Sequence, residues 1–371
     1  MSRERFKIIL RCLRFDKKET RKTRCKEDRF AAIRDIFEQF RSNCVSKYTP
    51  EAYLTIDEQL LPLKTRCKMI IYMPNKPDKF GFKFWILAEV NTKFVCNIFP
   101  YLGASERSER GDEPLADFVV LRLMQPFQNL GYNICCDNFF TSLPLARKLA
   151  AKKTSIVGTV RKNRRELSSE IVQNSTSQHD SKFFWQDEAK ACCVSYQCKK
   201  RKNVILLSTM HSSPSVSNQN EKRKPVIVEF YDSNKTGVDI HDRMNRQYST
   251  LSASRRWPLA IWSNILNIGA INAWIIFKKL TNSSISRRDF ILQLVENLRQ
   301  KHADPNASDE RRRKRCSVNE LFSVVEKRRK CQQSDCRNCS STICKECCKI
   351  TCGKCSAGEK QTFVMCKSCA M

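Results

Sequence analysis

The sequence contains few histidines and few glycines. Of its 371 residues only four are histidine and nine are glycine. It has no His-Glu-x-x-His zinc motif, no P-loop and no Gly-x-Ser-x-Gly elbow, which argues against the enzyme classes that depend on them. The scarcity of glycine also disfavours phosphate-cradling loops. His241 lies beside two carboxylates, and we expect it to be an exposed helix residue rather than a catalytic one.

Acidic residues are scarce relative to basic ones. The chain has 68 Lys and Arg against 38 Asp and Glu, a formal net charge of +30 at pH 7. Such an excess favours an anionic partner, nucleic acid ahead of an anionic membrane. The alternative is a very soluble protein with an ordinary basic surface. Hydrophobic residues make up 41%, enough for a sizeable core in two or three domains.

The sequence also lacks a clear targeting or membrane segment. Residues 1–15 are basic throughout and contain no continuous apolar run, so we expect no signal peptide. Residues 257–277 are long enough to span a membrane, but four polar residues interrupt them. A buried helix of a soluble domain fits this pattern better, and no membrane partner is expected. The interrupting residues are Ser263, Asn264, Asn267 and Asn272.

Hydrophobic periodicity predicts an α/β core between a helical front and a cysteine-rich tail. A strand is expected at 52–61 and another at 132–138, and the α/β pattern resumes at 226–231, before a helix from about residue 238. The expected organisation is a helical segment at 1–48, the first part of the core at 49–160, a β-rich insertion at 161–225, the last part of the core at 226–300, a basic linker at 301–330 and a cysteine-rich domain at 331–371.

Three places put aspartate where a sheet or helix start would otherwise be apolar. Asp57 lies inside an expected strand, Asp137 ends another, and Asp239 and Asp242 share a face at a helix start. Gathered at neighbouring strand ends, such carboxylates would repel one another, and Mg²⁺ would remove that repulsion. A two-metal site could then support phosphoryl transfer. The alternative is a strand-end cap, a turn residue and two carboxylates favoured by a helix dipole.

Ten of the 21 cysteines lie in the last 41 residues. Without a secretory signal the compartment is expected to be reducing, so metal ligation is favoured over disulfides. Eight cysteines form four short-spaced pairs, enough for two structural Zn²⁺ ions with four thiolates each. We expect interleaved pairing, with pairs one and three on one ion. The pairs are Cys331 and Cys336, Cys344 and Cys347, Cys352 and Cys355, and Cys366 and Cys369, leaving Cys339 and Cys348 over.

A basic run precedes this tail and is a candidate nuclear-localisation signal. Its alternative interpretation is a solvated tether that binds DNA non-specifically. The run consists of Arg311, Arg312, Arg313, Lys314 and Arg315.

Ten ordered stretches carry a resemblance to a known family. They are MSRERF at 1–6, RCLRF at 11–15, YTP at 48–50, LTIDEQL at 54–60, PNKPDKFG at 74–81, PYLG at 100–103, CDNFFTS at 136–142, IVGTVR at 156–161, GVDIHD at 237–242 and RWP at 256–258. With these motifs the chain resembles the piggyBac transposases over essentially its whole length.

The resemblance implies an RNase H-like catalytic domain with a β-rich insertion before the last catalytic aspartate. Its catalytic positions match Asp57, Asp137 and Asp239, with Asp242 as a further carboxylate ligand of Mg²⁺. Members of the family nick transposon ends, form and open a hairpin, and join the ends at TTAA sites. The leading expectation is therefore a cut-and-paste DNA transposase that binds double-stranded DNA.

The resemblance also assigns the flanking segments. The cysteine tail resembles a cross-brace zinc domain that binds the terminal repeats, with Cys355 where the family often has histidine. Residues 1–48 resemble part of a dimerisation and DNA-binding region, so a nuclear homodimer is expected. DNA contacts are expected at Arg256, Trp257 and the basic run 311–315.

The front of the chain departs from the family, in which the motif at 1–6 is internal and follows a longer, often acidic region. The chain is therefore expected to be short at its N-terminus. The first alternative function is a domesticated, sequence-specific DNA-binding protein without catalysis. A second is a chromatin adaptor that binds a protein partner through its zinc tail.

Overall fold

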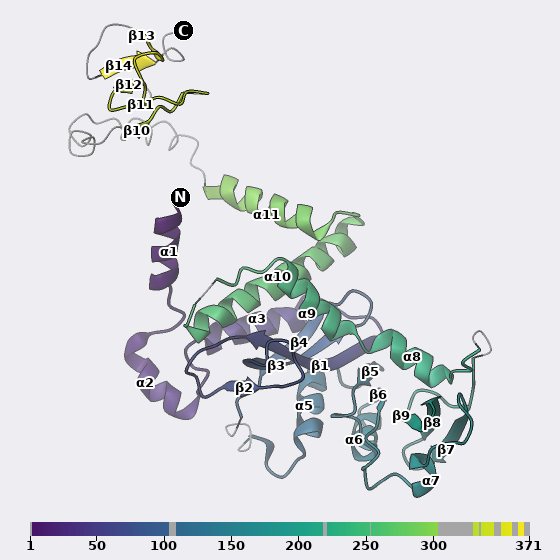
Figure 1. Cartoon of the computed structure of the whole chain (residues 1–371). Helices are drawn as coiled ribbons and strands as arrows, with labels where there is room; N and C mark the ends of the chain where they lie inside the picture. Colours follow the sequence, from purple (N-terminus) through teal and green to yellow (C-terminus); the bar gives the residue numbers. More distant parts are fainter. Residues whose placement is uncertain are drawn as a thin grey trace. The chain divides into compact units, whose positions relative to one another are not determined.

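The computed structural model describes residues 2–103, 109–217, 221–252, 254–302, 329–333, 335–344, 350–357 and 363–366 (Figure 1). The chain divides into two compact units, Met1–Ile285 and Ser286–Met371. The core had been expected to continue to residue 300, whereas the first unit ends at Ile285.

A nine-stranded mixed sheet forms the framework of the first unit. Its strands run in the order β2-β3-β1-β5-β6-β9-β8-β7, and β4 also pairs antiparallel with β3. β1, β5 and β6 are parallel, and β3 is antiparallel to β1, which is the RNase H-like arrangement expected from the resemblance. The strands are β1 (Tyr53–Pro62), β2 (Ile70–Tyr72), β3 (Phe80–Glu89), β4 (Val95–Pro100), β5 (Asn133–Cys136), β6 (Ser155–Thr159), β7 (Ser181–Gln186), β8 (Ala191–Lys199) and β9 (Lys202–Ser208).

Helices cover both faces of this sheet (Figure 1). Local sequence starts several of them: the Ser2 and Ser142 hydroxyls accept N-cap hydrogen bonds, and Pro258 occupies the first turn of the long helix α10. The helices of the first unit are α1 (Arg3–Cys12), α2 (Lys18–Glu27), α3 (Arg34–Ser46), α5 (Leu115–Met124), the 3-10 turn η1 (Gln125–Phe127), α6 (Leu143–Ala150), α7 (Ser169–Val172), α8 (Val226–Asn234), α9 (Gly237–Gln247) and α10 (Trp257–Thr281).

The core has a layer on each face of the sheet. On one face, Leu54 and Ile56 of β1 pack with helices α5 and α6. On the other, Phe84 and Ile86 of β3 pack with α3 and α10. β1 and β3 therefore alternate between two buried layers, as expected for the central strands of an α/β domain.

Helix α10 is the one described helix that is long and apolar enough to cross a membrane by length and composition. In this fold 61% of an apolar 18-residue stretch of the helix is buried. Its polar residues are used inside the domain: Asn264 donates to Gln59 (2.8 Å), and Asn272 donates to the carbonyl of Val95 (3.0 Å). These contacts are those of the buried core helix that the sequence predicts.

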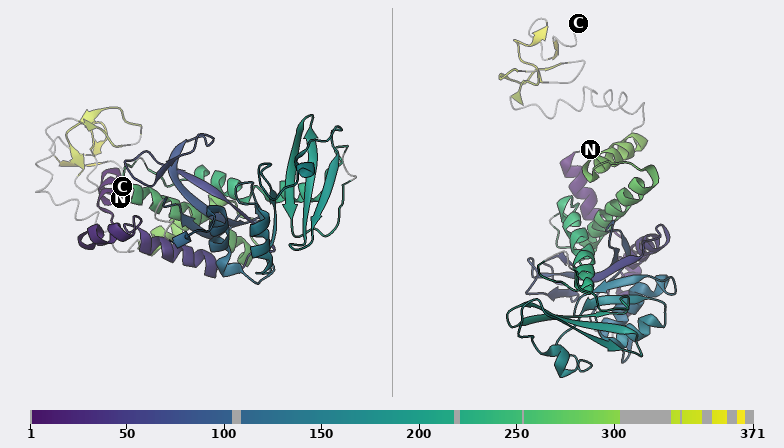
Figure 2. Two further views of the ribbon diagram at one scale, coloured as in Figure 1. Left: turned by 90° about the horizontal axis from the view of Figure 1, so that it is seen from below. Right: turned by 90° about the vertical axis from the view of Figure 1, so that its right-hand side faces the viewer.

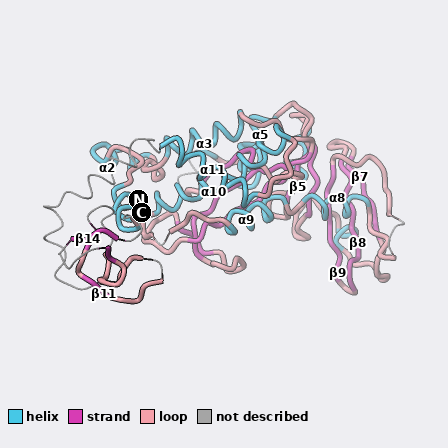
Figure 3. Tube along the Cα trace, turned by 90° about the horizontal axis from the view of Figure 1, so that it is seen from above, coloured by secondary structure: helices cyan, strands magenta, loops and turns pink. Residues whose placement is uncertain are grey.

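The β-rich insertion extends the main sheet instead of forming a separate one. β9 pairs antiparallel with β6, and Val157 lies opposite Ser208. Figure 2 and Figure 3 show β7, β8 and β9 at one end of the first unit. The α/β pattern that was expected to resume at 226–231 begins instead with a helix, because these residues form the first part of α8.

Within its described residues, the second unit contains α11 (Arg287–His302) and five short strands. The described residues pair β10 with β11, and β14 with both β12 and β13. The basic run 311–315 lies outside the described residues. The strands are β10 (Arg329–Lys330), β11 (Cys339–Ser340), β12 (Ile343–Cys344), β13 (Ser356–Ala357) and β14 (Phe363–Cys366).

Candidate active site

Asp57 and Asp137 lie side by side on two neighbouring parallel strands, Asp57 in the middle of β1 and Asp137 directly after the end of β5. The register pairs Ile56 of β1 with Cys136 of β5, so the aspartate that follows each of them lies at adjacent positions. Asp137 starts the turn into α6, and its carboxylate accepts a hydrogen bond from the backbone NH of Phe139 (2.9 Å). Sheet geometry thus brings together two carboxylates that are 80 residues apart in the chain.

Helix α9 carries the remaining two carboxylates to β1. The helix approaches so closely that a Cβ on Gly237 would lie 2.4 Å from Cγ2 of Thr55. Further along α9, Asp242 accepts a hydrogen bond from Nε2 of Gln59 (3.0 Å). Asp239, between these two contacts, is exposed. The helix that carries Asp239 therefore packs against the strand that carries Asp57, and the charges of both aspartates act on Lys76.

The surroundings of Asp57 and Asp137 disfavour negative charge on both carboxylates. Burial, then the charges of Glu58 and Asp137, raise the pKa of Asp57 to about 7. Burial also raises the pKa of Asp137, with Glu58 adding to the effect, while the Phe139 NH and Arg161 oppose it. A divalent cation with oxygen ligands would offset this repulsion, so the residues fit Mg²⁺. The ligand oxygens of Asp57, Asp137 and Asp239 do not all lie within 4.8 Å of one another.

Two lysines and a glutamate adjoin the carboxylates, and sequence patterns did not single them out. Lys76 and Lys83 lie 3.5 Å and 3.8 Å from the carboxylate oxygens of Glu58. Lys83 also lies 3.7 Å above the centroid of the Trp85 ring. Burial lowers the pKa of Lys83. Burial acts in the same direction on Lys76, but the negative charges of Glu58, Asp57 and Asp239 outweigh it and raise the pKa of Lys76. The site therefore holds cations suited to a phosphate.

The turn that carries Lys76 is fixed to helix α9. Arg246 of α9 forms an ion pair with Asp78 of the turn (2.7 Å) and a second one with Asp242 (3.3 Å). This contact joins the β2–β3 turn to the helix that carries Asp239. The one signal in the sequence was the resemblance stretch PNKPDKFG at 74–81, which covers this turn but assigned it no role.

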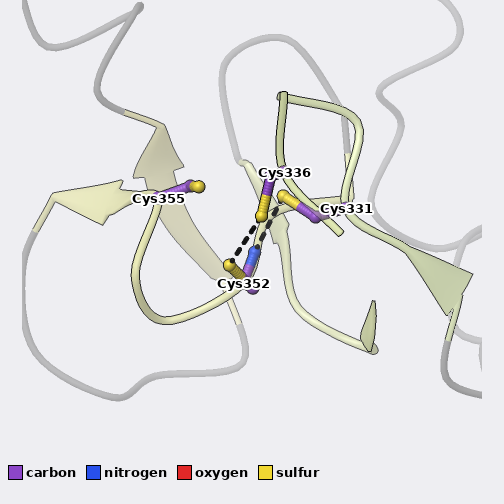
Figure 4. A group of neighbouring side chains, drawn as sticks. All are labelled: Cys331, Cys336, Cys352 and Cys355. Carbon is purple, nitrogen blue, oxygen red and sulfur yellow. Dashed lines mark hydrogen bonds between the residues drawn. The ribbon is translucent and has the colours of Figure 1, made fainter. Parts of the chain in front are cut away.

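A second cluster, in the cysteine tail, has the donors of a structural metal site. The sulfurs of Cys331, Cys336, Cys352 and Cys355 all lie within 4.8 Å of one another (Figure 4). Cys336 and Cys352 are 3.6 Å apart, close to the edge of about 3.8 Å expected for a tetrahedron with Zn–S bonds of 2.3 Å. This grouping unites the first and third pairs, as interleaved pairing predicts.

Hydrogen bonds favour the thiolate at Cys352, whereas those from Cys336 and Cys352 raise the pKa of Cys355 to about 12. Nδ2 of Asn338 donates to the sulfur of Cys352 (3.5 Å), and together with Cys336 this lowers the pKa of Cys352 to about 6, against the effect of burial. Cys344 is buried but lies outside the cluster, and Cys339 is exposed. The other expected ligands, Cys347, Cys369 and the side chain of Cys366, lie outside what the structure describes, as does Cys348.

Comparison with known proteins identifies the family. The family model described as Transposase IS4 matches residues 1–274. The chain belongs to the piggyBac-type IS4 transposases. The cryo-EM structure of the piggyBac transposase synaptic complex with hairpin DNA superimposes with a TM-score of 0.79 and 32% identity, covering 99% of this chain and 80% of the other.

Two curated human relatives are also similar. PiggyBac transposable element-derived protein 3 is 24% identical over 298 residues, which cover 75% of this chain and 49% of that protein. The human chimeric ERCC6-PGBD3 protein is also 24% identical over 298 residues, which cover 75% of this chain and 27% of that protein. The chain therefore spans about half of the first relative and about a quarter of the second.

The piggyBac motif RWP has a structural role in this fold. The guanidinium of Arg256 donates to the carbonyl oxygens of Leu10, Arg11 and Leu13 at 2.7–3.2 Å. The Trp257 ring stacks on Phe30, with 5.9 Å between centroids. Both residues thus fasten the helical front to the core, and their expected contact with DNA stays a prediction.

His241 differs from expectation. The sequence places it next to Asp242 and suggested an exposed helix residue, but its side chain is fully buried. Nδ1 lies 2.9 Å from the carbonyl oxygen of Lys93. The side chain points from α9 toward the β3–β4 turn, so it serves the packing of α9 rather than the carboxylates.

Proposed function

We propose that this protein is a cut-and-paste DNA transposase that cleaves and joins DNA by metal-dependent phosphoryl transfer. The main support is that Asp57 of β1 and Asp137, which follows β5, occupy adjacent positions on parallel strands, and that α9, which carries Asp239, packs on β1. Membership of the piggyBac-type transposases supports the same reaction class, and the solved relative is named as a complex with hairpin DNA. The proposed steps are nicking, hairpin formation, hairpin opening and joining at TTAA sites.

The residues have distinct proposed roles. Asp57, Asp137 and Asp239 would hold Mg²⁺, which supplies charge stabilisation at the attacking and leaving oxygens of phosphoryl transfer. Asp242 is already engaged by Gln59 and Arg246, so it would orient α9. Lys76 and Lys83 would bind non-bridging oxygens of the scissile phosphate, where charge accumulates. Glu58, between the two lysines, would position both.

We propose that the cysteine-rich domain and the excess of Lys and Arg over Asp and Glu both contribute to DNA binding. Each phosphate neutralised adds about 0.9 to the slope of log affinity against log salt. With a net charge of +30, affinity should fall steeply as salt rises. We also propose that the four clustered cysteines hold Zn²⁺, and that the protein acts as a homodimer in the nucleus.

The test is Mg²⁺-dependent cleavage of DNA that carries the repeats flanking this gene. The wild-type chain should nick this DNA and form hairpins, whereas Asp137→Asn should be inactive but still bind. Asp187→Asn, at an exposed carboxylate in the β7–β8 turn, is the matched control and should keep activity. Absence of cleavage by the wild-type chain, with specific binding preserved, would favour the alternative of a transposase-derived DNA-binding protein without catalysis.

A further inference from the structure

A cavity of about 240 Å³ lies where the insertion meets the catalytic core. Its walls come from β7, β8 and β9, from the segment after β6, and from the start of α6. Most of its lining is apolar, including Leu143, Leu167, Ile171 and Leu207, and Phe184 adds an aromatic ring. The cavity is smaller than the roughly 300–1,000 Å³ of drug-sized sites, so it fits one compact group.

Polar groups surround this apolar interior. Arg164, Glu166, Ser168 and Gln186 all contribute to the lining. The Nε atom of Arg164 is buried and has no hydrogen-bond partner among the described residues. A buried donor without a partner costs free energy, and a ligand with an acceptor would remove that cost. The cavity therefore combines a stacking surface with an unsatisfied donor and carboxylate and amide groups at its rim.

The cavity also adjoins the carboxylates. Arg164 donates to the carbonyl oxygen of Phe139 (3.4 Å), which follows Asp137 and Asn138 in the turn after β5. Arg161 donates from Nε to the side chain of Asn138 (3.2 Å), and its charge acts on Asp137. The segment between the carboxylates and the cavity is thus tied to the turn that carries Asp137.

This segment is strongly basic. Residues 161–165 read Arg-Lys-Asn-Arg-Arg, and Arg161, Lys162 and Arg165 are exposed. Three exposed cations beside an apolar cavity match a nucleotide, because its phosphates need positive charge and its base needs an apolar, aromatic surface. An apolar side chain of a protein partner would need neither the cations nor the buried donor.

We infer that this cavity receives one unpaired nucleobase of the DNA held at the carboxylates. The base stacks on Phe184 and accepts a hydrogen bond from Arg164, while its flanking phosphates lie along residues 161–165. A nucleotide turned out of the stack exposes the phosphate beside it, and such enzymes commonly house the base in an apolar pocket. The inference rests on the proposed function, since it requires DNA at Asp57 and Asp137.

The experiment measures binding of the full chain, without Mg²⁺, to three labelled DNAs by fluorescence anisotropy. They are a fully paired duplex, a hairpin whose tip carries unpaired bases, and the same hairpin with abasic tip positions. The variant is Phe184→Leu, which keeps apolar volume but loses the stacking plane. The control is Phe183→Leu, because Phe183 lies next to it on β7 but packs against the core beneath α8. Thermal unfolding checks that both variants fold.

Phe184→Leu should weaken binding to the base-bearing hairpin by about 5- to 100-fold, the range for one stacked base. Binding to the duplex and to the abasic hairpin should not change, and Phe183→Leu should behave as wild type. In a second measurement, 2-aminopurine at the tip should be quenched by the wild-type chain and less so by Phe184→Leu.

The contrary results separate the two proposals. Equal weakening on all three DNAs, or no weakening on any, overturns the base-binding cavity while leaving DNA binding intact. A wild-type chain that binds none of the three DNAs overturns both the cavity and the proposed function. If Phe184→Leu fails to fold, the wild-type comparison of base-bearing and abasic hairpins decides, and equal affinity overturns the cavity.

Discussion

Gln59 hydrogen-bonds to Asp242 across the contact between strand β1 and helix α9. Nε2 of Gln59 donates to Asp242 (3.0 Å), and Oε1 of the same side chain accepts from Asn264 of α10 (2.8 Å). Gln59 is almost fully buried and lies two positions after Asp57 on the same face of the strand. One amide therefore fixes two helices against the strand that carries a proposed metal ligand.

We expect Gln59→Leu to impair the site without touching the proposed ligands. The variant would leave the buried Nδ2 group of Asn264 without its acceptor and Asp242 without one donor, costing about 1–3 kcal/mol of unfolding free energy for the buried amide. With α9 less well held, the Mg²⁺ concentration for half-maximal cleavage should rise. Unfolding by denaturant and a Mg²⁺ titration of cleavage measure the two effects. An unchanged Mg²⁺ titration would show that Gln59 does not position Asp239.

Lys76 should contribute to cleavage but not to folding. Its ammonium group lies 3.5 Å from Glu58 and interacts with the charges of Asp57 and Asp239. Removing a cation that stabilises charge in the transition state costs on the order of 100-fold in rate. Lys76→Ala should therefore reduce the cleavage rate by about this factor, and Lys76→Arg should recover part of it.

Lys68→Ala is the control for this prediction, since Lys68 is an exposed lysine just before β2 that forms no ion pair with these carboxylates. Single-turnover rates at saturating DNA separate an effect on chemistry from one on binding. Equal losses in Lys76→Ala and Lys68→Ala would point to a general loss of DNA affinity and contradict the proposed role.

Gly237 of α9 lies so close to Thr55 of β1 that it is difficult to replace. A Cβ there would lie 2.4 Å from Cγ2 of Thr55, so Gly237→Ala must displace either the Thr55 side chain or the start of α9. We expect a loss of about 1–3 kcal/mol in unfolding free energy, typical of overpacking, together with weaker cleavage. Gly269→Ala is the matched control, because its Cβ would meet only Phe40 at 3.8 Å. Within α10 this change should stabilise by up to about 1 kcal/mol.

Both variants are compared by chemical denaturation. A Gly237→Ala protein as stable as wild type would mean that α9 can shift freely on β1. That result would also remove the argument that Gly237 sets the position of Asp239.

The parts of the fold that follow from local patterns could be predicted from the sequence. The strand expected at 132–138 overlaps β5, and the β-rich insertion expected at 161–225 contains β7, β8 and β9, because alternating side chains and polar turns mark them. The placement of Asp57 beside Asp137 needed the pairing of β1 with β5, which a family resemblance implied but no pattern could establish.

The helix α8 shows where local pattern is insufficient. Its residues 226–231 are a short apolar run with β-branched side chains, which suits a strand or a buried helix equally. The fold decides through packing: Ile227, Val228 and Tyr231, at helical spacing, are buried against the sheet. The contacts of Lys76 and Arg246 were missed for a related reason, since Arg246 and its partner Asp78 are 168 residues apart.

Acid should weaken the helical front through Asp16. Its carboxylate is 1% exposed and accepts hydrogen bonds from Arg21 (2.9 Å) and Arg24 (2.8 Å). The hydrogen bond from Arg21, opposed by burial, holds the pKa of Asp16 below its ordinary value of 3.8. Because the folded pKa is the lower one, this stabilisation is complete above about pH 4 and is lost as the pH falls through the folded value.

Asp16→Asn should therefore be less stable than wild type at pH 7, by about 1–3 kcal/mol, and the difference should shrink below pH 4. Asp35→Asn, an exposed aspartate at the start of α3, serves as the control and should change stability by less than about 0.5 kcal/mol. Denaturation curves from pH 7 to pH 3 test this. A difference between Asp16→Asn and wild type that is independent of pH would contradict the ionic origin.

Metal binding by the clustered cysteines can be tested by counting ions. A segment this small has little core of its own, and thiolate ligation of Zn²⁺ supplies about 10–16 kcal/mol in zinc-finger peptides. Cys336→Ser should therefore lose one zinc per chain and expose the tail to protease, whereas Cys339→Ser should do neither, because Cys339 is exposed and lies outside the cluster. Metal analysis of the purified full chains gives the count, and limited proteolysis reports on the tail. If both variants kept the wild-type zinc content, the four sulfurs would be free thiols that happen to lie together, and the tail would need another source of stability.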